Sequence, residues 1–161
     1  MNDNRNDWTS SLWQVLGGAN RAPGAEPPLL SLAYLGDAIY DAYVRARLVG
    51  AGGGRPRKLH NSAVARVHAA AQARVLDKLE PLLTDAERDV IRRARNARPG
   101  HVPRSAKAAD YHRSTAFEAL LGFLLWTGQA ERLSEVLASA WTAADALAAE
   151  AAASPEPHAE A

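Results

Sequence analysis

Apolar residues recur every three to four positions through most of this chain, a spacing typical of amphipathic helices. No stretch shows the strict alternation that would predict a strand. Thr84-Asp85-Ala86-Glu87 forms a capping box that should start a helix at Asp85. Gly- and Pro-rich segments separate the apolar stretches. We therefore expect an all-α fold of about six helical segments, over residues 8–16, 29–49, 58–79, 85–96, 110–127 and 129–152.

Composition suggests one compact domain. The chain has 161 residues, 47% of them hydrophobic, which is enough for a substantial core. We expect an N-terminal segment with a short helix over residues 1–28, the main domain over 29–152, and a disordered tail over 153–161. The chain has no cysteine, which excludes disulfides and thiolate metal sites. A polar start and the absence of a long apolar run predict a cytoplasmic protein with no membrane segment.

A net charge of +1 conceals strong charge segregation. Seven basic residues and no acidic residue lie between Asp41 and Asp77. The segment from Arg88 to Arg113 contains eight basic residues and only two acidic ones. Such basic segments are typical of a surface that binds a polyanion. The alternative is a set of solvated helix faces with no binding role.

Two acids stand in otherwise apolar helical stretches, each near a glycine. Asp37 directly follows Gly36, and Glu118 lies one turn before Gly122. Taken alone, each acid could simply pair with an arginine at the edge of the core. Brought together on crossing helices, the two carboxylates would suit a hard cation such as Mg²⁺, which can activate water and stabilise charge on a phosphate.

Several motifs in order resemble the ribonuclease III family. Residues 32–40, with a central Leu-Gly-Asp-Ala run, resemble the signature segment of its catalytic domains, and residues 117–122 resemble its second acidic motif. Further stretches at 58–60, 93–98 and 111–118 resemble the Mini-ribonuclease III subfamily, which has a catalytic domain only. The resemblance covers about residues 29–137.

This resemblance implies a homodimeric, all-α endonuclease domain that cleaves double-stranded RNA with Mg²⁺ and leaves 5′-phosphate and 3′-hydroxyl ends. Asp37 matches the catalytic aspartate and Glu118 the metal-binding glutamate, so both are our candidate catalytic and metal-binding residues. The full-length family carries two further acids, four residues before Asp37 and three residues before Glu118. In this chain Ala33 and Thr115 occupy these two positions. We therefore expect a metal site with two protein carboxylates.

RNA binding should come from the catalytic domain itself, because no room is left for a separate RNA-binding domain. A-form RNA is recognised largely by its shape, phosphates and 2′-hydroxyl groups. We assign phosphate contacts to six basic residues: Arg57, Lys58, Arg95, Arg98, Arg104 and Lys107. We assign 2′-hydroxyl contacts to Asn96 and His60.

The resemblance points to maturation of the precursor of large-subunit (23S) ribosomal RNA, in the cytoplasm and with ribosomal proteins nearby. A non-catalytic RNA- or ribosome-binding module on the same fold is the alternative. A third hypothesis is an all-α interaction protein that binds no nucleic acid. The two acids favour the enzyme, and the basic segments disfavour the third hypothesis.

Overall fold

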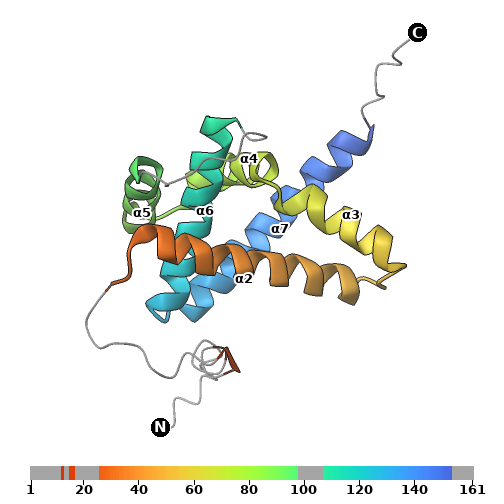
Figure 1. Ribbon diagram of the computed structural model, residues 1–161, viewed down its shortest axis with the longest axis horizontal. Coiled ribbons are helices and arrows are strands. Elements are labelled where there is room, and N and C mark those ends of the chain that lie inside the picture. The colour runs from red at the N-terminus through yellow and green to blue at the C-terminus, as the bar shows by residue number, and fades with distance from the viewer. Residues whose placement is uncertain (1–11, 13–14, 17–25, 98–106, 154–161) are drawn as a thin grey trace.

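Six α-helices and one 3₁₀ turn make up the part of the chain that the structure describes, a computed structural model covering residues 12, 15–16, 26–97 and 107–153 (Figure 1). In chain order they are α2 (Leu29–Gly50), α3 (Pro56–Val67), α4 (Ala69–Leu79), η1 (Glu80–Leu82), α5 (Asp85–Asn96), α6 (Ala108–Trp126) and α7 (Ala130–Ala153). These residues contain no strand, and the predicted all-α fold is confirmed. None of their helices has the length and apolar character needed to cross a membrane.

Helix α6 forms the centre of the core. It packs against α2, α4, α5 and α7, which surround it in Figure 1. Its side chains from Ala116 to Leu125 are almost all inaccessible to solvent, and Phe117 meets Tyr40 of α2 edge to face at 5.0 Å. A helix that is apolar on nearly all sides belongs in the interior, and this burial fixes α6 relative to its neighbours.

Two glycines allow the backbones of α2 and α6 to touch. A Cβ atom on Gly36 would lie 1.8 Å from the carbonyl oxygen of Glu118, and one on Gly122 would lie 2.0 Å from that of Leu32. No side chain fits at either position. The close approach sets Asp37, next to Gly36, beside the α6 backbone at Glu118.

The single helix predicted over residues 58–79 is wrong, because the structure has two helices that meet at His68. The His68 backbone is extended, with φ −69° and ψ 154°. Its Nδ1 atom accepts a hydrogen bond from the Ala71 amide at 3.2 Å and so caps the start of α4. The break needs neither glycine nor proline, and the apolar pattern continues across it.

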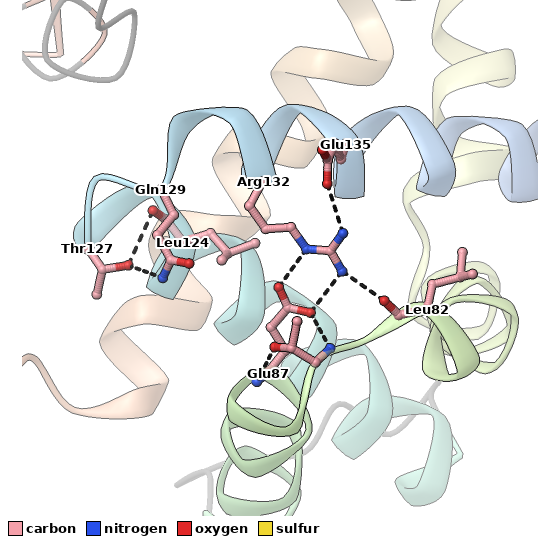
Figure 2. A network of polar contacts seen from close by, with 8 residues as sticks. Leu82, Glu87, Leu124, Thr127, Gln129, Arg132 and Glu135 are labelled. Carbon is pink, nitrogen blue, oxygen red and sulfur yellow. Dashed lines mark hydrogen bonds and ion pairs between the residues drawn. The ribbon is translucent and has the colours of Figure 1, made fainter.

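An ion pair between buried Glu87 and partly exposed Arg132 joins the start of α5 to α7 (Figure 2). The Arg132 guanidinium donates to both carboxylate oxygens of Glu87, at 2.7 and 3.0 Å, and to the Leu82 carbonyl oxygen at 2.9 Å. Glu87 is also half of the predicted capping box, since it accepts a hydrogen bond from the Thr84 amide at 2.8 Å. This arrangement holds α5, η1 and α7 in one unit.

The ends of the chain are described only in part. Most of the predicted helix over residues 8–16, and the tail from 154 onward, lie outside the described residues. Helix α7 itself ends at Ala153. The division into an N-terminal segment, a main domain and a tail therefore stays a prediction.

Candidate active site

The structure brings the two singled-out acids together where α2 crosses α6. Their carboxyl groups lie close enough to interact although the residues are far apart in the sequence. Asp37 is exposed, and Glu118 is partly buried. The pair therefore opens to solvent on the Asp37 side, where a large substrate could reach it.

Both carboxyl groups resist ionisation in the metal-free protein. Burial, followed by the charge of Asp37, raises the pKa of Glu118 to about 8. Partial burial and the nearby charge of Asp41 raise the pKa of Asp37. Among the residues that the structure describes, no Lys, Arg or His side chain pairs with either acid, so the arginine-paired alternative finds no support there. Two close carboxyl groups without a cationic partner have the chemistry of a cation site.

The pair fits a divalent ion that keeps much of its hydration. Within the described ranges no group of three acids or histidines is placed to hold a metal ion. Ala33 is buried in the core, and the Thr115 hydroxyl donates to the Tyr111 carbonyl oxygen at 2.9 Å. Mg²⁺ commonly binds through one or two carboxylates and retains several waters, so two protein ligands suffice.

Sequence reasoning missed a third polar residue at this site, Gln72 of α4. Its side chain is 1% exposed and interacts with the carboxyl groups of Asp37 and Glu118. Its Nε2 atom also donates to the Val67 carbonyl oxygen at 2.8 Å. The available signal was a single glutamine within an otherwise apolar stretch of small residues, over 69–73.

The candidate RNA-binding residues fall in separate places. Arg57, Lys58 and His60 are exposed on the first two turns of α3. No ion pair involves these three side chains in the described structure. They are therefore available to a polyanion.

The other candidates differ in their surroundings. Asn96, at the end of α5, and Lys107, just before α6, are exposed. Arg95 forms an ion pair with Glu80, which partly neutralises it. Arg98 and Arg104 lie outside the described residues.

Comparison with known proteins identifies the family. The model of the ribonuclease III domain matches residues 30–129, well over half of the chain. The chain belongs to the ribonuclease III family. It is therefore an endoribonuclease, and the match covers both acids of the site.

Individual relatives show which subfamily of the ribonuclease III family this chain resembles. A Mini-ribonuclease 3 from Symbiobacterium thermophilum is 55% identical over 70% of this chain and 87% of its own length. A Mini-ribonuclease 3 from Brevibacillus brevis is 43% identical over 75% of this chain and 90% of its own length. A crystal structure of a Fusobacterium nucleatum protein superposes with a TM-score of 0.63 and 27% identity, over 70% of this chain and 89% of that one. The expected resemblance to the Mini-ribonuclease III subfamily is confirmed.

Proposed function

We propose that this endoribonuclease cleaves double-stranded RNA by Mg²⁺-dependent hydrolysis, with Asp37 and Glu118 holding the metal, and leaves 5′-phosphate and 3′-hydroxyl ends. The observation that carries the proposal is the pair of interacting carboxyl groups at the α2–α6 crossing, which has no described cationic partner. Two close, partly buried acids with only a structural role would lower the stability of the fold. A bound cation would offset the repulsion between the two ionised carboxylates.

The two acids have different tasks in this proposal. Asp37 is exposed and would face the scissile phosphate, while Glu118 lies deeper and would hold the cation from the protein side. When bound, Mg²⁺ would supply an activated water and stabilise negative charge on the phosphate. Because the raised pKa of Glu118, about 8, favours its protonated form at neutral pH, Glu118 must release this proton before it binds a cation.

We assign RNA binding to exposed basic and polar residues near the ends of α3, α5 and α6. The described members are Arg57, Lys58, His60, Asn96 and Lys107, with Arg95 already partly neutralised; Arg98 and Arg104 complete the predicted set. Side chains of this kind contact phosphates and 2′-hydroxyl groups without reading a sequence.

We further propose a homodimer in which each protomer cuts one strand. Helix α2 exposes an apolar face, with Tyr34 85% accessible and Ala38 one turn later. Beside it lies an open apolar groove of about 730 Å³, lined by Leu35, Ile39 and Leu137 among others. Exposed apolar surface of this kind favours association. Light scattering should give the mass of a dimer, and Tyr34→Glu should shift it towards the monomer.

The natural substrate that we propose is the precursor of 23S ribosomal RNA, processed in the cytoplasm beside ribosomal proteins. The similarity to the Mini-ribonuclease III subfamily supports this choice. Cells lacking the protein should accumulate 23S precursors with unprocessed ends, which primer extension would detect.

One experiment separates the enzyme from a non-catalytic RNA-binding module on the same fold. Purified protein is incubated with long duplex RNA in Mg²⁺ or in EDTA, and Asp37→Asn is compared with Asp41→Asn, a matched change one turn along α2. We expect cleavage only with Mg²⁺, its loss in Asp37→Asn and its retention in Asp41→Asn. Binding without cleavage in the wild-type protein would instead support the module.

A further inference from the structure

We propose that Gln72 is a positioning residue of the metal site, whose side-chain amide holds the carboxyl groups of Asp37 and Glu118 in the arrangement that a shared cation requires. The inference rests on the proposed function and adds a residue to it that neither acidic motif contains. Its basis is the geometry around the junction of α3 and α4.

The Gln72 side chain lies deep in an apolar environment. It is 1% exposed, and its helix neighbours Ala71, Ala73 and Val75 are buried as well. Its Oε1 atom has no hydrogen-bond partner. A buried oxygen without a partner costs stability, and this cost is only partly offset because the same side chain pairs the Val67 carbonyl oxygen. A stability cost at such a position is expected where a residue serves the site rather than the fold.

The break at His68 provides the anchor for this side chain. In a continuous helix the Ala71 amide would donate to the Val67 carbonyl oxygen. Here that amide donates to His68 Nδ1 instead, at 3.2 Å, and the Val67 carbonyl accepts from Gln72 Nε2 at 2.8 Å. The Gln72 side chain also lies beside both acids and interacts with their carboxyl groups. Gln72 thus ties the end of α3 to carboxyl groups on α2 and α6.

This link would fix the acids in a way that helix packing alone does not. The close contact at Gly36 positions the two helix backbones, but a glutamate side chain still has several rotatable bonds. A buried donor that is itself anchored restricts the orientation of the Glu118 carboxylate. Partners of this type, which orient a metal ligand without touching the metal, typically change metal affinity or activity about 10–100-fold.

The test measures metal binding without RNA and without turnover. The melting temperature of the full chain is followed while Mg²⁺ is added, and the midpoint of the rise reports metal affinity. Gln72→Met keeps the side-chain length but removes the amide. Leu79→Met, two turns further along the same buried face of α4, is the matched control for a change in core packing. Cleavage of duplex RNA is measured in parallel to separate kcat from KM.

For Gln72→Met we expect a Mg²⁺ midpoint at least about 10-fold higher and a lower kcat, with KM for RNA unchanged because Gln72 is buried. Leu79→Met should keep the wild-type midpoint. Should Gln72→Met fail to fold, Gln72→Asn decides, because it retains an amide that is too short to span Val67 and the acids. A wild-type midpoint in the folded variant overturns the role of Gln72 alone. A wild-type protein that Mg²⁺ does not stabilise overturns the proposed function itself.

Discussion

Replacing Glu118 with glutamine should remove a pH-dependent loss of stability from the metal-free protein. Burial and the charge of Asp37 raise the pKa of Glu118 from 4.5 to about 8. Between these two values the folded protein keeps a proton that the unfolded chain releases. Because the folded state then binds more protons, its stability must fall as the pH rises through this range. Glutamine has nearly the same shape and stays neutral, so the variant lacks this contribution.

The size of the effect follows from the same two pKa values. At about 1.4 kcal/mol per pKa unit, the free energy of unfolding of the wild-type protein should drop by about 3 kcal/mol between about pH 6 and pH 9 through Glu118. Domains of this kind are stable by only about 5–15 kcal/mol, so the drop is readily measured. The substitution that removes a proposed metal ligand should therefore make the metal-free protein more stable at alkaline pH.

Urea unfolding in EDTA, at several values across this pH range, is the assay. The matched control is Glu131→Gln, which removes an exposed acid from the first turn of α7. The control should keep the wild-type pH dependence, and Glu118→Gln should flatten it. Parallel curves for wild-type protein and Glu118→Gln would refute the view that Glu118 is held protonated by its surroundings.

Three further predictions concern packing, the ion pair and RNA binding. Arg132→Met leaves Glu87 buried without its partner and should lower the free energy of unfolding by about 3–5 kcal/mol in urea titrations, whereas an effect below about 1 kcal/mol would contradict the role of this pair. Gly122→Ala places a methyl group 2.0 Å from the Leu32 carbonyl oxygen, so a clear fall in melting temperature and in cleavage is expected, and an unchanged melting temperature would rule out the backbone contact. Binding of duplex RNA should weaken steeply with salt, and Lys58→Ala should reduce the slope of log K against log salt by about 1; an unaltered slope would remove Lys58 from the interface.

The sequence predicted those parts of the fold that local chemistry determines. The capping box at Thr84 fixed both the start and the identity of α5, because its hydrogen bonds are made within one turn. Prolines and glycines similarly located the ends of α2. The break at His68 was missed because a histidine cap and a side-chain bond across the junction produce it, and neither disturbs the apolar periodicity.

The candidate site also has one part that the sequence could predict and another part that it could not. The meeting of Asp37 and Glu118 was predictable, because a glycine near each acid signals that two helices approach closely. The role that we propose for Gln72 could not be predicted from the sequence, since it depends on where α4 begins. Arg95 was assigned to a phosphate from its place in a basic segment, yet it pairs with Glu80, fifteen residues earlier in the chain. Pairings of this kind are set by tertiary packing.

The central claim is that Asp37 and Glu118 bind one Mg²⁺ ion together. Calorimetric titration of Mg²⁺ into the wild-type protein, Asp37→Asn, Glu118→Gln and the double variant tests it most directly. If the acids share the ion, each single change should remove most of the binding, and the double variant should lose little more. Wild-type affinity in either single variant, or losses that simply add, would contradict a shared site.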